Sequence, residues 1–429
     1  MSMAARTPKP TSMASAEMRP PDGAAGNRAS NGRDFAARWR TLREDARFRA
    51  AVARLRPDAD EPEVCDGVIW SLITEPGDGV AGALIATLGA TQAWEAAAGG
   101  QAGAPGQRED AERPAAGALR QGRQRWAPRL DAEAHLGALR TAARIGATLL
   151  LPGDPEWPAS VADLGAHAPL ALWLRGDAAA LSGHGVALVG ARASSSYGEH
   201  VAGEFAGELA AEGRIVFSGG AYGIDGTAHR AALRAGGVTV AVLAGGVDRP
   251  YPSGHAQLFE RIVASGALVS EVACGVAPTK WRFLARNRLI SALSAATVVV
   301  EAGQRSGSLN TAGHAAALGR PLGAVPGPVT STASAGCHRL LRDYDARCIT
   351  SVADVRELLG VTVTAAPMTA EDPDMVRLAD ALNARAARSA LELAQRSGLS
   401  LERVEALLGI LELDGSVVRS AGGWRSILQ

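Results

Sequence analysis

The chain has 429 residues, of which 47% are hydrophobic and 21% charged, and a formal net charge of zero, which together indicate a soluble globular protein of two or three domains. No apolar run reaches the roughly 18–20 residues of a membrane-spanning helix, and the N-terminus lacks the apolar core of a signal peptide, so we expect a cytoplasmic protein with no membrane span. Because the net charge is zero, a polyanionic partner would have to be bound by a local basic patch.

The first 146 residues divide into a tail and a helical segment. Residues 1–33 are rich in Ala, Ser, Pro and Gly without hydrophobic periodicity, which predicts a disordered tail. Residues 34–146 have the apolar spacing of helices and predict a small helical domain. Its expected parts are a helix from Phe35 to about Arg54, helices on both sides of the loop Glu75–Gly79, a flexible stretch near Gly99–Gly106 and a helix over Arg125–Ile145.

Six short apolar runs follow between Val186 and Val329, and most of them precede a segment of helix length. Such runs are typical of strands that are buried on both faces, as in a parallel sheet with crossover helices. We therefore predict an α/β domain over residues 147–361, whose sheet is extended by strands near Leu149 and over Leu170–Leu174. Ligands of such sheets bind at the loops that follow the carboxyl ends of the strands.

The end of the chain predicts a separate domain. Residues 362–369, a Thr/Ala/Pro stretch, are typical of a linker, and residues 370–429 contain helix and strand patterns of their own. A helix-turn-helix followed by a hairpin predicts a winged-helix domain. The expected elements are helices over Met375–Leu382, Ser389–Ser397 and Leu401–Leu413, the last with Ser400 as its N-cap, and two strands that meet near Gly422.

The helix over Leu401–Leu413 has the wrong charge for reading DNA. It carries Glu402, Glu405 and Glu412 but only one arginine, Arg403. A helix that binds DNA would be basic. We therefore expect the winged-helix domain to contact protein or to dock on another domain.

Three glycine-rich loops in the α/β segment each follow an apolar run and precede a helix. They span Gly190–Gly198, Ser218–Thr227 and Gly303–Thr311. Backbone amides in such loops favour an anion, and Arg192 and the loop hydroxyls add further donors. None of the loops has the dinucleotide Gly-x-Gly-x-x-Gly fingerprint or a Walker sequence, which disfavours a nicotinamide or ATP enzyme. In the second loop, Asp225 is expected to cap the following helix.

The segment Pro278–Arg288 combines cations with aromatic rings. It contains Lys280, one of the two lysines in the chain, together with three arginines, Trp281 and Phe283, and no acidic residue lies between Glu271 and Glu301. Cations on phosphates and aromatic rings on bases hold single-stranded nucleic acids without reading their sequence. Two aromatic residues separated by an arginine cannot both face the core without burying charge, so we expect a binding segment.

The loops are rich in hydrogen-bond donors and poor in bases. They contain no Ser-His-Asp set, Cys–His pair or paired carboxylates, and the four cysteines and eight histidines have no metal-ligand spacing. We therefore expect no catalytic residue, no metal and no cofactor. The candidate residues for binding single-stranded DNA are Arg192, Ser194, Ser218, Gly219, Gly220, Gly223, Lys280, Phe283, Arg286, Asn287, Arg288, Ser306, Gly307 and Ser308.

These same loops resemble the DprA/Smf family, the DNA-processing proteins of natural transformation. The matching motifs are Val-Gly-Ala-Arg at Val189, Ser-Gly-Gly-Ala-Tyr-Gly-Ile-Asp at Ser218, Tyr-Pro at Tyr251, Arg-Asn-Arg-Leu-Ile-Ser-x-Leu-Ser at Arg286 and Ser-Gly-Ser-Leu-x-Thr-Ala at Ser306. The resemblance is strong over about residues 147–361 and looser in the flanking helical and winged-helix segments. The chain departs from the family at Asn310, where isoleucine is common.

The resemblance implies an extended Rossmann-like fold with an N-terminal helical domain of the SAM or helix-hairpin-helix type. It also implies a homodimer that binds and protects single-stranded DNA and loads the RecA recombinase. The family's binding arginine corresponds to Arg192, and its Lys-x-x-Phe pair corresponds to Lys280 and Phe283. Two alternatives remain: a Rossmann-like nucleotide phosphoribohydrolase, whose Pro-Gly-Gly-x-Gly-Thr signature is absent from the loop at Arg305, and a structural scaffold.

Overall fold

The computed structural model describes residues 23–99, 114–182, 184–360, 372–420 and 422–427. It divides into two units, residues 1–360 and 361–429, and each is described by itself. Within the first unit, the helical segment and the sheet do not form separate units. They share a hydrophobic core that includes Trp70 from the helices and Trp173 from the sheet.

The N-terminal part of the first unit is helical, as expected. Its helices are α1 (Gly23–Glu44), α2 (Ala46–Ala53), α3 (Pro62–Ile73), α4 (Gly79–Ala97), α5 (Ala116–Trp126), the 3₁₀ helix η1 (Ala127–Arg129) and α6 (Ala132–Arg144). Their core is aromatic: Trp39, Trp70 and Trp126 are fully buried. The ring centroids of Trp39 and Trp70 lie 5.0 Å apart, and the Trp70 indole nitrogen donates to the carbonyl oxygen of Ala90 at 3.0 Å.

Several helix boundaries differ from the prediction. The predicted tail is too long, since α1 already begins at Gly23 and no proline interrupts the sequence between Pro21 and Pro57. Residues 1–22 of the tail lie outside the described residues, and so does most of the predicted stretch Gly99–Gly106. The predicted helix from Phe35 breaks at Asp45, whose carboxylate accepts a hydrogen bond from the amide of Arg47 and caps α2.

A nine-stranded sheet forms the centre of the first unit, in the order β1-β2-β6-β5-β4-β3-β7-β8-β9. All six predicted apolar runs contain strands of its parallel part, and β1 and β2 extend the sheet at one edge, as expected. Strand β2 pairs antiparallel with β6, and β1 pairs antiparallel with β2. The strands are β1 (Thr148–Leu150), β2 (Leu172–Gly176), β3 (Gly185–Gly190), β4 (Ile215–Ser218), β5 (Thr239–Val242), β6 (Ala267–Ser270), β7 (Ala296–Glu301), β8 (Leu322–Ala324) and β9 (Arg347–Cys348).

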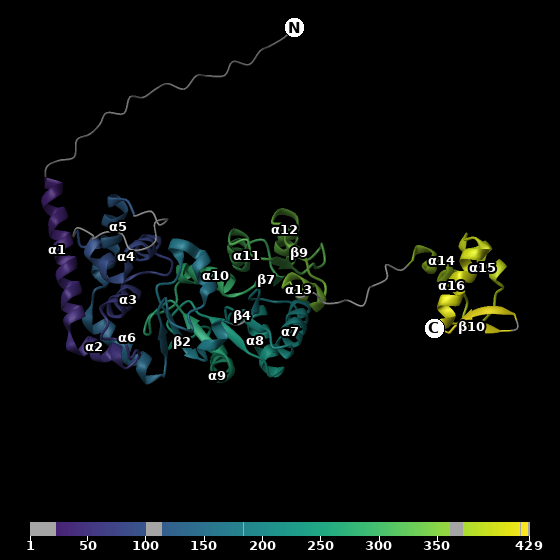
Figure 1. The fold of residues 1–429 in the computed structure, drawn as a ribbon, viewed down its shortest axis with the longest axis horizontal. Coiled ribbons are helices and arrows are strands. Elements are labelled where there is room, and N and C mark those ends of the chain that lie inside the picture. The colour runs from purple at the N-terminus through teal and green to yellow at the C-terminus, as the bar shows by residue number, and fades with distance from the viewer. Residues whose placement is uncertain (1–22, 100–113, 183, 361–371, 421, 428–429) are drawn as a thin grey trace, which may run out of the picture. The chain divides into compact units, whose positions relative to one another are not determined.

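Helices cover both faces of this sheet (Figure 1). On one face, Phe205 and Ile224 pack with Val186 and Val216, and on the other, Ile290 packs with Phe217. The helices of this part are α7 (Ser196–Ala211), α8 (Ile224–Arg234), α9 (Ala256–Ser265), α10 (Lys280–Leu293), α11 (Ser308–Ala317), α12 (Ala335–Asp343) and α13 (Val352–Leu358), with the 3₁₀ helices η2 (Ala159–His167), η3 (Ala178–Leu181) and η4 (Ser253–His255).

The strand order reverses at β3. Strand β4 pairs with one edge of β3, and β7, which is much later in the chain, pairs with the other. The loops after β3 and β7 therefore leave the sheet in opposite directions and open a crevice between them, which is where ligands of doubly wound sheets bind.

The second unit has the predicted winged-helix elements. They are α14 (Pro373–Ala381), α15 (Ala390–Ser397), α16 (Leu401–Leu413) and the antiparallel hairpin of β10 (Val417–Ser420) and β11 (Gly423–Ser426). Ser400 caps α16 as expected, since its hydroxyl accepts from the amide of Arg403 at 3.3 Å. Leu393, Val404 and Leu408 are buried in its core. In neither unit does a helix within the described ranges combine the length and apolarity needed to cross a membrane.

Candidate nucleic-acid interface

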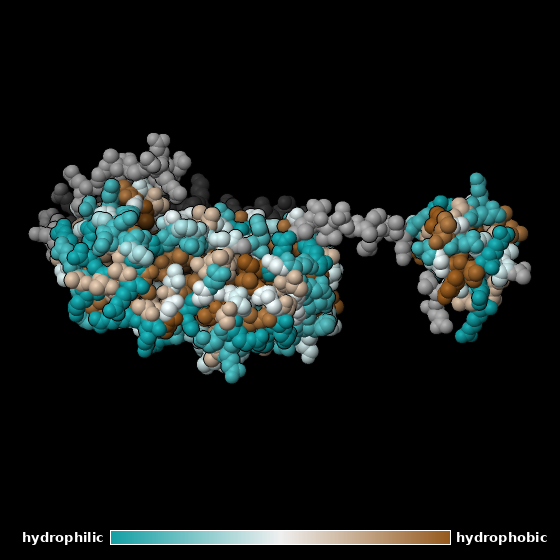
Figure 2. Space-filling view, turned by 60° about the horizontal axis from the view of Figure 1, so that its bottom comes forward, coloured by the Kyte–Doolittle hydropathy of each residue, from teal (hydrophilic) through white to brown (hydrophobic). Residues whose placement is uncertain are grey.

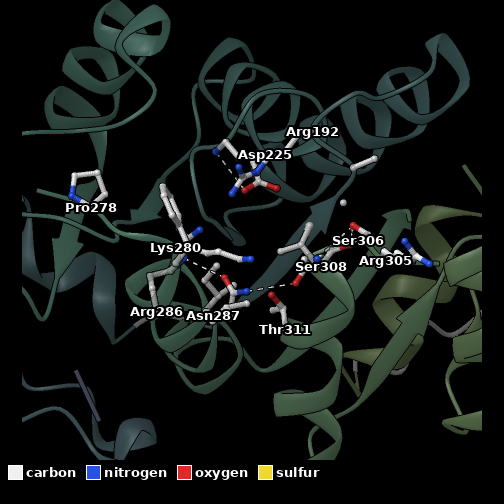
Figure 3. Close-up of a pocket in the computed structure, with 18 of the residues that line it drawn as sticks. Arg192, Asp225, Pro278, Lys280, Arg286, Asn287, Arg305, Ser306, Ser308 and Thr311 are labelled. Atoms are coloured by element: carbon white, nitrogen blue, oxygen red, sulfur yellow. Dashed lines mark hydrogen bonds between the residues drawn. The ribbon is translucent and has the colours of Figure 1, made fainter. Parts of the chain in front are cut away.

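A pocket of about 1050 Å³ lies at the carboxyl ends of β3 and β7. Its walls come from the loop after β3, the loop after β7 and the first turns of α10. Figure 3 shows Arg192, Lys280, Ser306 and Ser308 around its opening. The sheet topology thus brings together the three segments of the chain that carry most of the predicted binding residues.

Three cationic side chains at this pocket are free to bind an anion. Arg192, Lys280 and Arg305 line it and are exposed. Within the described part of the chain, none of these three side chains makes a hydrogen bond or an ion pair. The acidic residue among the lining residues is Asp225, which is only 6% exposed. The pocket therefore presents uncompensated positive charge to solvent.

Aromatic side chains lie directly beside these cations. The Arg192 guanidinium carbon is 5.1 Å from the centroid of the Phe283 ring, which is cation–π geometry. Tyr251, from the loop after β5, meets Phe283 at a centroid distance of 5.8 Å and is 52% exposed. Nothing in the sequence shows that the loop of Tyr251 reaches Phe283, so only the structure places this ring at the pocket.

Arg286, a predicted DNA ligand, is instead buried beneath the pocket. Its guanidinium donates to the carbonyl oxygens of Gly219, at 2.7 Å, and Val242, and to the side-chain oxygen of Asn287 at 3.2 Å. Burial lowers the pKa of Arg286 to about 10, although the negative charge of nearby Asp225 opposes this shift. The prediction for Arg286 is corrected: its donors are used to hold α10 against the loop after β4.

Arg288 and Arg282 are also paired within the protein. Arg288 is 6% exposed and forms an ion pair with Glu271 at 2.5 Å. Arg282 donates two hydrogen bonds to the carboxylate of Glu75 in the helical segment, at 2.8 and 3.0 Å. The charges of Arg288 and Arg282 are thus matched within the protein, and the geometry gives no support to the predicted contact of Arg288 with DNA or to the cationic role expected of Arg282.

The backbone amides of the loop after β4 are bound by a carboxylate of the protein itself. Ser218, Gly219 and Gly220 are buried. Asp225 does not cap α8 as expected; instead, its carboxylate accepts from the amides of Gly219, at 3.1 Å, and Ala221, at 3.3 Å. Ser218, Gly219 and Gly220 therefore shape the loop and are not exposed to a ligand, which corrects the prediction that they bind DNA.

Gly223 has a packing role in the same loop. Its φ is +74°, and a Cβ there would lie 2.2 Å from the carbonyl oxygen of Ala191. Glycine is therefore required for the loop after β4 to pass so close to the loop after β3. The residue supports the pocket wall that carries Arg192.

Glu301, for which no role was predicted, occupies the position at the N-terminus of α7 where an anionic ligand could otherwise bind. It is 3% exposed at the end of β7 and accepts from the amide and the hydroxyl of Ser195 at 2.8 and 2.7 Å. Ser195 is the N-cap of α7, so this helix N-terminus already has a carboxylate. Ser194 beside it donates to Glu199. A buried acid at the end of an apolar strand was the signal in the sequence that could have identified this role.

The loop after β7, Gly303–Thr311, remains open to the pocket. Ser306 and Ser308 share a hydrogen bond of 2.7 Å between their hydroxyls, and Gly307 is exposed. The side-chain nitrogen of Asn287 donates to the carbonyl oxygen of Gly307 at 3.4 Å and to the side-chain oxygen of Asn310 at 3.2 Å. Asn287 therefore holds α10 beside this loop. No cluster of three His, Cys, Asp or Glu side chains that could hold a metal occurs in the described ranges.

Comparison with protein families and with known proteins gives a consistent assignment. Residues 148–360 match the family model of DNA recombination-mediator protein A, and residues 363–423 match that of the DprA winged helix domain. The chain is 47% identical over 302 residues to a putative DNA processing protein DprA of Mycobacterium tuberculosis, which covers 66% of this chain and 77% of that protein. It is 43% identical over 194 residues to protein Smf of Escherichia coli, which covers 45% of this chain and 52% of that protein.

Solved structures with related sequences come from two other bacteria. DNA processing protein A of Streptococcus pneumoniae has a TM-score of 0.49 and 34% identity, covering 56% of this chain and 81% of that chain. The protein of Helicobacter pylori, whose structure describes a single-stranded DNA binding mode, has a TM-score of 0.46 and 29% identity, covering 50% of this chain and 95% of that chain. From the matches to both family models and the identity to the Mycobacterium relative, this chain belongs to the DprA family of DNA recombination-mediator proteins.

Proposed function

We propose that this protein binds single-stranded DNA in the pocket at the carboxyl ends of β3 and β7. The observation that carries the proposal is the convergence of Arg192, Lys280 and Phe283 on one pocket that presents three unpaired cations. The cations would contact phosphates, and Phe283 and Tyr251 would stack on bases. The open loop with Ser306, Gly307 and Ser308 supplies hydroxyl and amide donors to the same strand.

The aromatic rings favour single strands over duplexes. A base can stack on a side chain only when its face is not covered by neighbouring bases, and stacking on a protein ring is worth roughly 1–3 kcal/mol per base. Phosphate contacts alone would serve either form of DNA. We therefore expect the preference for single strands to depend on Phe283 and Tyr251.

The alternative function, a nucleotide phosphoribohydrolase, is less well supported by the site. Enzymes with glycine-rich loops on this fold hold phosphates at helix N-termini. Here the amides near the N-termini of α7 and α8 bind the protein's own carboxylates, Glu301 and Asp225. Incubation with nucleoside monophosphates, followed by chromatography for free base, tests this alternative directly.

We further infer that the bound strand is passed to the RecA recombinase. In this proposal, a homodimer protects incoming single-stranded DNA and loads RecA on it during natural transformation or related DNA processing. The support is membership of the DprA family, whose model is described as a recombination mediator. The test is whether this protein restores the DNA-dependent ATPase activity of RecA on single strands covered by single-strand-binding protein.

The proposed binding is tested by comparing single- and double-stranded oligonucleotides in a gel-shift assay at two salt concentrations. We expect tighter binding of the single strand and weaker binding of both at higher salt, because phosphate contacts release counterions. Equal affinity for both forms would contradict the stacking role of the aromatic residues. No binding at all would leave the scaffold alternative.

A further inference from the structure

Trp281 is unusually exposed for a tryptophan of this chain. It is 63% exposed, whereas Trp39, Trp70, Trp126 and Trp173 are fully buried. An isolated exposed hydrophobic residue is common on protein surfaces. Trp281, however, immediately follows Lys280 at the start of α10 and lines a second pocket.

The second pocket lies between α10 and the helical segment and has a volume of about 670 Å³. Its acidic lining residues are neutralised: Glu75 pairs with Arg129 at 2.6 Å, and Asp78 pairs with Arg125 at 3.1 Å. Asp78 also accepts from the indole nitrogen of Trp126 at 2.9 Å. The pocket is therefore an aromatic and nearly neutral site, which suits an uncharged base better than a phosphate.

The two pockets flank the same helix end. Successive residues of an α-helix are rotated by about 100°, so Trp281 and Phe283 point to nearly opposite sides of α10. Phe283 and Lys280 line the first pocket, and Trp281 lines the second. The first turn of α10 contains no acidic residue, unlike those of α7 and α8. A strand that crosses this turn would meet no negative side chain of the turn itself.

We propose that Trp281 is a second base-stacking site for the same DNA strand. The strand would leave the pocket at β3 and β7, cross the first turn of α10 and place a base on the indole ring beside the helical segment. Arg125 and Arg129, whose side chains are 48% and 38% exposed, would lie along this continuation. The inference rests on the proposed function and extends it to the helical segment of the protein.

The experiment compares thymidine oligonucleotides of two lengths with the full-length protein, by fluorescence anisotropy. A strand of roughly 6 nucleotides would occupy the first pocket alone, and one of roughly 20 would reach both. We expect Trp281→Ala to weaken binding of the long strand about tenfold and to leave the short one unchanged, since one stacked base is lost. Trp281→Phe should restore most of the affinity, and Lys280→Ala should weaken both lengths.

Direct contact is tested by photo-crosslinking a long strand that contains 5-iododeoxyuridine, with the crosslinked peptide identified by mass spectrometry. We expect a crosslink at Trp281 with the long strand and none with the short one. If Trp281→Ala leaves the long-strand affinity unchanged, or weakens both lengths equally, the inference is overturned while the proposed function stands. If the variant impairs only the stimulation of RecA, the exposed ring is a protein contact and the inference is likewise overturned. If the unmodified protein binds neither strand, the proposed function itself fails.

Discussion

Arg192, Lys280 and Arg305 are the side chains on which we expect the salt dependence of DNA binding to rest. All three are exposed at the first pocket and unpaired within the described residues. Each phosphate contact on a single strand contributes about 0.7 to the slope of log affinity against log salt concentration. Lys280→Ala or Arg192→Ala should therefore weaken binding of every sequence and reduce that slope by about 0.7, measured by anisotropy at four salt concentrations.

Two variants serve as controls for this charge assignment. Arg234→Ala removes an exposed cation from the C-terminal end of α8 and should leave affinity and slope unchanged. Phe283→Ala removes stacking and no charge, so it should lower the affinity and keep the slope. A slope that falls as much for Phe283→Ala as for Lys280→Ala would show that the two roles are not divided as proposed.

His229 should make the fold sensitive to acid. It is fully buried, and its Nδ1 lies 2.7 Å from the hydroxyl of Thr239, which itself donates to the carbonyl oxygen of Val216. Nδ1 must therefore carry the hydrogen atom of the neutral ring. In the described structure the buried Nε2 has no hydrogen-bond partner, so a second hydrogen atom on the charged ring would have no acceptor. Burial, helped by the charges of His255 and Arg230, lowers the pKa of His229 to about 3.

The sign of the pH effect follows from this shift. The unfolded chain binds a proton at His229 near pH 6.5 and the folded chain does not, so stability is lost as the pH falls below that value. We expect a loss of about 2 kcal/mol in the free energy of unfolding between pH 7 and pH 5. Urea titrations should show that His229→Asn removes this part of the pH dependence and that the exposed His184→Asn does not. An unchanged pH dependence in His229→Asn would contradict the assignment.

At the scale of elements, the sequence predicted the strands of the sheet well, but it predicted poorly which arginines are paired within the protein. Apolar runs such as Val186–Gly190 predicted strands buried on both faces, and the carboxyl ends of parallel strands predicted a site at that edge of the sheet. The order of the strands within the sheet was not predicted and comes from the structure. The arginines of α10 are indistinguishable in sequence, yet Arg286 is buried and Arg282 binds Glu75, a residue 207 positions away. Only the tertiary partner decides which cation remains free, and a single sequence does not show that partner.

The ion pair of Arg282 and Glu75 should hold α10 on the helical segment. Burial raises the pKa of Glu75, but Arg282 and Arg129 outweigh this effect and keep it below its usual range. Glu75→Gln should lower the free energy of unfolding by about 2 kcal/mol, because Arg282 loses its charged partner. It should also weaken DNA binding, since the first turn of α10 carries Lys280 and Trp281.

The matched control is Glu133→Gln, which removes the partner of Arg47 in an ion pair whose side chains are 57% and 69% exposed. Such exposed pairs contribute little to stability, because solvent screens their charges. Both variants are compared by urea denaturation at neutral pH. If Glu75→Gln is no more destabilising than Glu133→Gln, the docking role of Glu75 is refuted.

For the molecule as a whole, the two units differ in the surface that they offer to DNA. The first unit holds the pocket with its three free cations. The second has exposed hydrophobic side chains, which appear as brown patches on its surface in Figure 2, and the cation of its helix α16, Arg403, is paired with Asp372 and Asp374. Among residues 372–420 and 422–427, the exposed large hydrophobic side chains are those of Val376, Leu391, Leu401, Ile410, Leu413 and Ile427. This surface suits contact with protein.

Deletion of residues 370–429 should therefore leave binding of single-stranded DNA within about tenfold of the full-length affinity. The physical reason is that α16 exposes Glu402, Glu405 and Glu412, which repel phosphates, so its removal costs no favourable contact. Anisotropy with a long thymidine strand measures this, and replacement of the exposed hairpin arginines Arg419 and Arg425 by alanine in the intact chain provides the matched control. A loss of more than about tenfold in both experiments would place DNA on the hairpin and contradict a protein-contact role for this unit.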